Sequence, residues 1–157
     1  MFHVEQARVR LPNGRRTTLD IVRHRGSVVL IPQPAPGKVI LIRQYRYAIN
    51  QWIWELPAGT LDPGERPAAA ARRECAEEIG LAPGKVTRLT ELYPTPGFCD
   101  EVMLFYRCTE LKAPRRPPAH DPDEQIEPRV FTIAEARRLI ERRQVVDMKT
   151  VVGLTLI

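Results

Sequence analysis

Cysteine is scarce in this sequence, and its spacing argues against a disulfide-stabilised or zinc-binding protein. The chain has 157 residues and three cysteines, Cys75, Cys99 and Cys108, with no C-x-x-C pair. A disulfide framework needs more cysteines, and a zinc site needs cysteines and histidines at short, regular intervals. Because neither pattern is present, we expect reduced thiols and no zinc site.

Long apolar segments are also missing. No run approaches the roughly 18 residues that a transmembrane helix needs. The first residues, MFHVEQARVRL, lack the apolar core and the small-residue cleavage site of a secretory signal. With 43% hydrophobic and 27% charged residues, the composition is that of a globular protein. We therefore expect one domain over residues 1–157, located in the cytoplasm and without a membrane partner.

Aromatic residues are few, while positive charge is in excess. Aromatics make up 6% of the chain, and its formal net charge is +5. Much of this charge comes from arginines in residues 1–25, which form either a solvated surface or a field that attracts an anion. A surface that binds single-stranded nucleic acid places aromatics among its basic residues, and this segment does not. The composition thus favours a small phosphate compound over nucleic acid.

Turn residues and apolar periodicity divide the chain into strands and helices. Asn13 and Gly14 supply the tight turn of a hairpin within residues 1–25. Further strands are expected at residues 27–32, 39–45, 52–56, 85–95 and 101–110, and a proline-rich loop at residues 112–128. Helices are expected at residues 67–79 and from Thr132, while the tail at 147–157 fits either a strand or a helix. This order indicates an α+β fold.

The first of these helices carries three glutamates on one side. Glu74 and Glu78 are one turn apart, and Glu77 lies beside them. Carboxylates at this spacing repel one another, and a hard divalent cation with oxygen ligands, Mg²⁺ or Mn²⁺, would offset that repulsion. Gly59 allows the preceding chain to turn, which can bring the backbone carbonyl of Ala58 to the same ion. The pattern predicts a metal site.

The segment from Gly59 to Leu81 resembles the signature of the Nudix hydrolases, G-x5-E-x7-R-E-U-x-E-E-x-G-U, where U is a bulky apolar residue. The matching residues are Gly59, Glu65, Arg73, Glu74, Glu77, Glu78, Gly80 and Leu81. Cys75 stands where an aliphatic residue is usual, which changes packing and leaves the carboxylates intact. The resemblance implies a Nudix fold, an α/β/α sandwich with a central mixed sheet and the catalytic loop and helix, residues 59–81, at its edge.

The same resemblance implies a metal-dependent pyrophosphatase. Glu74, Glu77 and Glu78, with the carbonyl of Ala58, would hold Mg²⁺, with Mn²⁺ as a substitute. The ions would neutralise a diphosphate and activate the attacking water.

Features outside this motif resemble the ADP-ribose pyrophosphatase branch of the family. The stretch ELPAG begins with Glu55, and RQYR ends with Arg46, which matches a substrate-contacting arginine. Pro96 stands at the spacing from Gly80 that marks the branch, and the loop containing Pro96, Gly97 and Phe98 resembles its substrate-facing loop. The resemblance implies hydrolysis of ADP-ribose to AMP and ribose 5-phosphate, with Arg46 on the diphosphate and Glu55 near metal or water.

An acidic segment, DPDEQI, matches the loop that adds a further glutamate to the metals in relatives. Glu124 is the best match for that glutamate. Pro122 and Asp123 stand where relatives carry acidic residues, so the identity of the general base is left open. The branch also implies a homodimer in which the hairpin of residues 1–25 is exchanged between subunits.

Two alternatives fit the same motif. One is a Nudix enzyme that acts on another nucleoside diphosphate derivative, such as a GDP-sugar, a flavin dinucleotide or a damaged nucleoside triphosphate. The other is a non-catalytic module that senses a ligand or binds nucleic acid through its basic surface. Mg²⁺-dependent hydrolysis across a substrate panel separates them.

Overall fold

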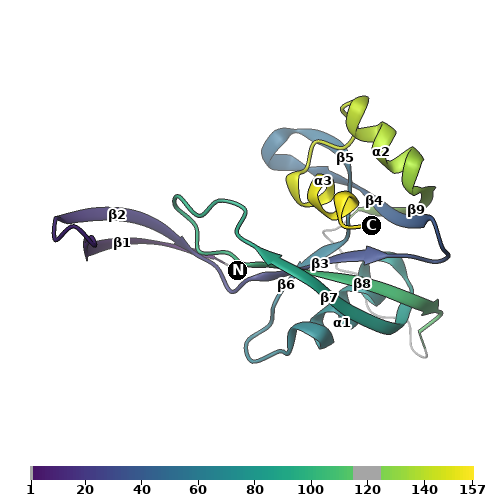
Figure 1. Cartoon of the computed structure of the whole chain (residues 1–157), viewed down its shortest axis with the longest axis horizontal. Helices are drawn as coiled ribbons and strands as arrows, with labels where there is room; N and C mark the ends of the chain where they lie inside the picture. Colours follow the sequence, from purple (N-terminus) through teal and green to yellow (C-terminus); the bar gives the residue numbers. More distant parts are fainter. Residues whose placement is uncertain (1, 115–124) are drawn as a thin grey trace.

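The computed structural model describes residues 2–114 and 125–157, which form two sheets, a projecting hairpin and the helices around them (Figure 1). The mixed sheet has the order β6 (Ala58–Thr60), β3 (Ser27–Pro32), β8 (Met103–Lys112) and β7 (Ala82–Leu92). Strands β3 and β8 are parallel, and the other neighbours are antiparallel. The antiparallel sheet has the order β5 (Gln51–Glu55), β4 (Lys38–Arg46) and β9 (Ile126–Thr132).

Strands β3 and β4 lie between two helical layers (Figure 1). Helix α1 (Pro67–Ile79) packs on one face of these strands, against Val28, Leu30, Ile40 and Ile42. The residues that alternate with these four along β3 and β4 point to the other face, where they pack with helices α2 (Ile133–Glu141) and α3 (Met148–Thr155). Successive side chains of a strand point to opposite faces, so β-branched residues at consecutive positions bury both faces. The predicted α/β/α sandwich is confirmed, and its mixed sheet is accompanied by the second, antiparallel one.

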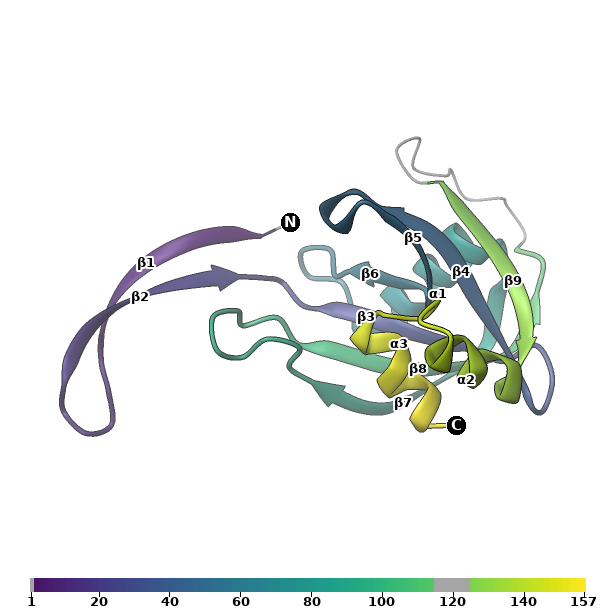
Figure 2. The same cartoon turned by 90° about the horizontal axis from the view of Figure 1, so that it is seen from above.

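Strands β1 (His3–Arg10) and β2 (Arg16–Arg23) form a hairpin that extends away from the two sheets (Figures 1 and 2). Gly14 supplies a left-handed residue, with φ of 83°, at its turn. At the base of the hairpin, the Val22 amide donates to the Phe98 carbonyl at 2.7 Å, and the Asp100 amide donates to the Val22 carbonyl at 3.1 Å. The predicted hairpin is confirmed, and the loop before β8 holds its base.

The predicted helices have the expected ends. Helix α1 covers residues 67–79, and Gly80 ends it with φ of 69°. Helix α2 begins at the capping box between Thr132 and Glu135. The ambiguous tail contains helix α3, which starts where the Asp147 carboxylate accepts from the Thr150 amide at 3.0 Å.

Two segments expected to be loops contain strands. Residues 126–128 open β9, although they belong to the proline-rich stretch predicted as a loop. Pro128 lacks an amide donor, and β9 is an edge strand, so the sheet tolerates this proline. Residues 58–60 form the short strand β6 beside β3. Within the described residues, no helix is long and apolar enough to cross a membrane.

Candidate active site

Helix α1 presents its glutamates beside the mixed sheet. Pro67 occupies the first turn of the helix, where a missing amide donor costs nothing. The small apolar residues Ala70, Ala71 and Cys75 are fully buried against the strands. This close packing leaves Glu74 only 9% exposed and Glu78 only 8% exposed. The two carboxylates therefore lie at the margin of the core rather than on a solvated face.

Strand β6 runs directly against these carboxylates. A Cβ atom at Gly59 would overlap the carboxylate of Glu74, so only glycine allows this approach. The neighbouring Ala58 amide donates to Oε2 of Glu78 at 3.2 Å. Gly59, the first glycine of the motif, is thus required because the Glu74 carboxylate of α1 lies directly against it.

Arg73 binds three glutamates of the motif, Glu65, Glu74 and Glu77. Its Nη1 donates to Oε1 of Glu74 at 2.7 Å and to Oε2 of Glu77 at 2.8 Å. Its Nε and Nη2 bind the two carboxylate oxygens of Glu65 at 3.0 and 2.9 Å. The hydrogen bond to Glu65, followed by the charge of Glu74, raises the pKa of Arg73, and the hydrogen bond from Arg73 lowers the pKa of Glu65. The arginine thereby binds three carboxylates at once and favours the charged form of Glu65.

The donor set of this region suits a hard cation. Glu74, Glu77 and Glu78 offer only oxygen, and the space at Gly59 admits a carboxylate beside the backbone of β6. Within residues 2–114 and 125–157, no three acidic, histidine or cysteine side chains are arranged to hold an ion. Because Nη1 of Arg73 binds both Glu74 and Glu77, an ion would compete with the guanidinium for these oxygens.

Arg46 and Glu55 form a two-point ion pair across strands β4 and β5. Nε of Arg46 lies 2.6 Å from Oε1 of Glu55, and Nη2 lies 2.8 Å from Oε2. Glu55 is 1% exposed, whereas the Arg46 side chain is 42% exposed. The hydrogen bond to Glu55 is the main cause that raises the pKa of Arg46, and the charge of Glu78 adds to it. The charge of Glu78 on α1 therefore acts on Arg46.

Helix α3 supplies functional candidates that the sequence reasoning missed. Lys149 contacts Oε2 of Glu55 and donates to Oδ2 of Asp147 at 3.0 Å. Oγ1 of Thr150 donates to the same Asp147 oxygen at 2.6 Å and accepts from the Leu56 amide at 2.7 Å. The Asp147–Thr150 spacing is a helix-capping signal that could have indicated the helix, but nothing local indicates its contact with Glu55.

The other predicted site residues are Pro96, Gly97, Phe98 and Glu124. Pro96, Gly97 and Phe98 belong to the loop that holds the base of the hairpin, and the Phe98 side chain is 57% exposed. Glu124 lies outside the described residues. The roles of these residues, and of the Ala58 carbonyl, stay predictions.

Comparison with known proteins identifies the family. A model of the NUDIX domain matches residues 22–149. The chain is 38% identical over 142 residues to an ADP-ribose pyrophosphatase of Bacillus subtilis, covering 90% of this chain and 77% of that protein. It is 35% identical over 155 residues to an ADP-ribose pyrophosphatase of Mycobacterium tuberculosis, covering 98% of this chain and 75% of that protein.

A solved structure of an ADP compounds hydrolase superposes with a TM-score of 0.86 and 26% identity, over 99% of this chain and 84% of that one. The two structures therefore agree over the whole fold and not only at the helix that carries the glutamates. Together with the intact motif at residues 59–81, these matches establish that the chain belongs to the Nudix family.

Proposed function

We propose that this protein hydrolyses the pyrophosphate bond of a nucleoside diphosphate sugar, with ADP-ribose as substrate and AMP and ribose 5-phosphate as products. The observation that carries this proposal is the set of glutamates on α1, held against β6 by the approach of Gly59 to Glu74. The names of the Bacillus subtilis and Mycobacterium tuberculosis relatives support the choice of ADP-ribose.

Glu74, Glu77 and Glu78, with the carbonyl of Ala58, are the groups that would hold Mg²⁺, or Mn²⁺ in its place. When bound, the ion supplies positive charge to the diphosphate and a more acidic water molecule. The chain itself contributes the positions of these oxygens, because the burial of α1 fixes Glu74 and Glu78. Glu124 is proposed to complete the set.

Arg46 is proposed to orient the diphosphate. Glu55 engages its Nε and Nη2, which leaves Nη1 outside that pair. A guanidinium held by two hydrogen bonds has little freedom to rotate, so its remaining donors are fixed in direction. The loop with Pro96, Gly97 and Phe98 is proposed to line the nucleotide site beside the hairpin.

We further propose a cytoplasmic homodimer in which the hairpin β1–β2 reaches the partner subunit. The hairpin projects from the sheets and carries Arg8, Arg10, Arg15 and Arg16 (Figure 2). Such an exchange would bring positive charge to an anionic ligand. Light scattering on the full chain tests this: a mass of two chains is expected, and a monomer that persists at high concentration would contradict it.

The activity is tested by incubating the protein with ADP-ribose, a GDP-sugar, a flavin dinucleotide and an oxidised nucleoside triphosphate, each with Mg²⁺ or with EDTA. We expect AMP to appear from ADP-ribose at the highest kcat/KM, and only with the metal present. A higher kcat/KM on another compound would reassign the substrate. Binding of ADP-ribose without hydrolysis of any compound would point to a ligand-sensing module.

A further inference from the structure

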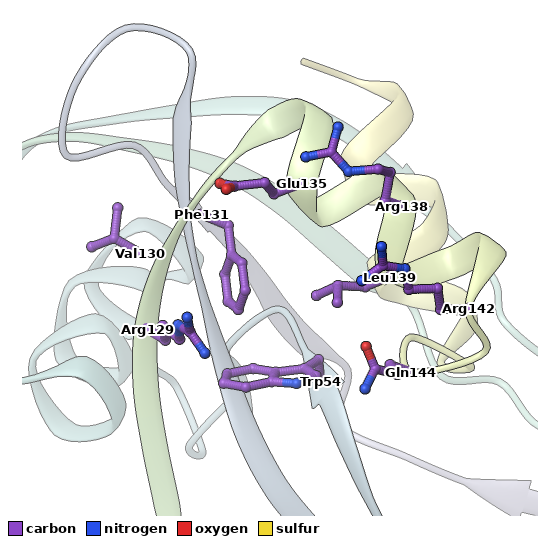
Figure 3. Close-up of a pocket in the computed structure, with 9 residues that line it drawn as sticks. All are labelled: Trp54, Arg129, Val130, Phe131, Glu135, Arg138, Leu139, Arg142 and Gln144. Carbon is purple, nitrogen blue, oxygen red and sulfur yellow. The ribbon is translucent and has the colours of Figure 1, made fainter.

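A hollow of about 390 Å³ lies on the face of the antiparallel sheet that is covered by α2 (Figure 3). Trp54 of β5 and Phe131 of β9 form its apolar wall, and Arg138 and Arg142 reach it from α2 and the end of that helix. Arg129 lies on the opposite side from Arg142, with the Trp54 ring between them (Figure 3). The volume falls in the range of sites that hold small organic molecules.

The charge of this hollow is positive. Of its described lining residues, three are arginines, Arg129, Arg138 and Arg142, and one is acidic, Glu135. Glu135 already accepts from the Thr132 amide at 2.8 Å as part of the capping box. The Thr132 hydrogen bonds chiefly lower the pKa of Glu135, with a contribution from Arg138 and Arg129. The guanidinium groups thus outnumber the carboxylate, so an anionic group is favoured here.

The walls are held in place without a ligand. The rings of Trp54 and Phe131 meet edge to face at 4.9 Å, and the guanidinium of Arg129 lies over the Phe131 ring at 5.2 Å. The Trp54 amide donates to the Gln144 carbonyl at 3.0 Å, and the Gln144 amide donates to the Leu139 carbonyl at 2.9 Å. These contacts fix the end of α2 against β5, so little order is lost when a ligand enters.

We propose that this hollow binds a mononucleotide, with a planar base on the Trp54 ring and a phosphate monoester at Arg138 and Arg142, the two arginines of α2 and its end. Aromatic stacking suits any base, and arginine forks suit phosphate oxygens. The site is separate from the candidate active site. Trp54 and Glu55 are consecutive residues of β5, so their side chains point to opposite faces of the sheet.

The test observes Trp54 directly. The chain contains two tryptophans, so Trp52→Phe leaves Trp54 as the source of one indole N–H signal in a nitrogen-15 spectrum. AMP is titrated in EDTA, without metal or substrate, so that the result does not depend on the proposed hydrolase activity. We expect a saturable shift of the indole signal, and weaker binding of adenosine and of inorganic phosphate, since each supplies only half of the contacts.

Variants of neighbouring arginines provide the matched comparison. Arg142→Gln and Arg138→Gln, each in the Trp52→Phe chain, should weaken AMP binding about tenfold or more. Arg143→Gln removes the same charge one residue away, outside the hollow, and should change the affinity less than twofold. Arg46→Gln should leave the indole titration unchanged, because Arg46 belongs to the other face. A shift that does not saturate, or equal losses in the Arg142 and Arg143 variants, would overturn the proposal.

Discussion

Lys149 on helix α3 contacts the carboxylate of Glu55 on strand β5, and both side chains are almost fully buried, at 8% and 1% exposure. Glu55 uses the same carboxylate to hold the partly exposed Arg46. A buried carboxylate between two cations is compensated in charge, so it can orient the outer guanidinium at the candidate active site. The C-terminal helix is thereby linked to the proposed diphosphate contact.

Lys149→Met should lower the free energy of unfolding by about 3 to 5 kcal/mol, because Glu55 loses a buried positive partner. Denaturant unfolding measures this. Lys38→Met, at an exposed position at the start of β4, is the control and should stay within about 0.5 kcal/mol of the parent protein. Equal, small effects of the two substitutions would show that the Lys149–Glu55 contact contributes little.

Gly59→Ala should reduce Mg²⁺-dependent turnover about a hundredfold, because the new Cβ displaces the Glu74 carboxylate. Gly64→Ala is the comparison: its φ of 76° makes alanine strained, but nothing lies within 4 Å of the added atom. The Gly64 variant should lose about 1 kcal/mol of stability and retain most of its turnover. Parallel assays of ADP-ribose hydrolysis and unfolding distinguish the two effects, and a fully active Gly59→Ala protein would contradict the assigned role of Glu74.

Arg46→Gln should raise the KM for ADP-ribose about tenfold, with a smaller change in kcat, if Arg46 binds the diphosphate equally in the ground and transition states. Arg43→Gln removes a positive charge from the other face of the same strand, where Arg43 lies 3.9 Å from Glu127. That control should leave KM within twofold of the parent value. If both substitutions change KM alike, the effect of Arg46 is one of general charge rather than of a directed contact.

The contribution of Glu65 to stability should depend on pH. Its folded-state pKa is lowered, chiefly by the hydrogen bond from Arg73. Its stabilisation is therefore present above the unfolded pKa, near 4.5, and is lost as the pH falls through the folded value. Glu65→Gln should be less stable than the parent protein at pH 7, and the difference should vanish in strong acid. Unfolding curves that keep a constant offset at every pH would refute this linkage.

The parts of the fold that the sequence could predict are those with local signals. Pro67 and Gly80 mark the ends of α1, and Thr132 and Glu135 mark the start of α2, because caps act within a single turn. The start of β9 was missed because a proline-rich stretch indicates a loop, and only the edge position of the strand makes Pro128 acceptable.

In the candidate site, too, the features with local sequence signals could be predicted and those that depend on tertiary contacts could not. Glu74, Glu77 and Glu78 could be predicted because they share one face of a helix. That Arg73 donates hydrogen bonds to both Glu74 and Glu77 could be learned only from the structure, since it depends on side-chain conformation. Lys149 and Glu55 lie far apart in the chain, so the apolar periodicity of the sequence cannot predict their contact.

The central claim is that the glutamates of α1 support hydrolysis, and Glu78→Gln tests it most directly. Glutamine keeps an oxygen that can accept the hydrogen bond from the Ala58 amide, so the fold should be retained while a negative charge is removed. The measurement is AMP release from ADP-ribose with Mg²⁺, alongside the thermal unfolding of both proteins. We predict a loss of turnover by orders of magnitude at an unchanged melting temperature; near-normal turnover would contradict the account.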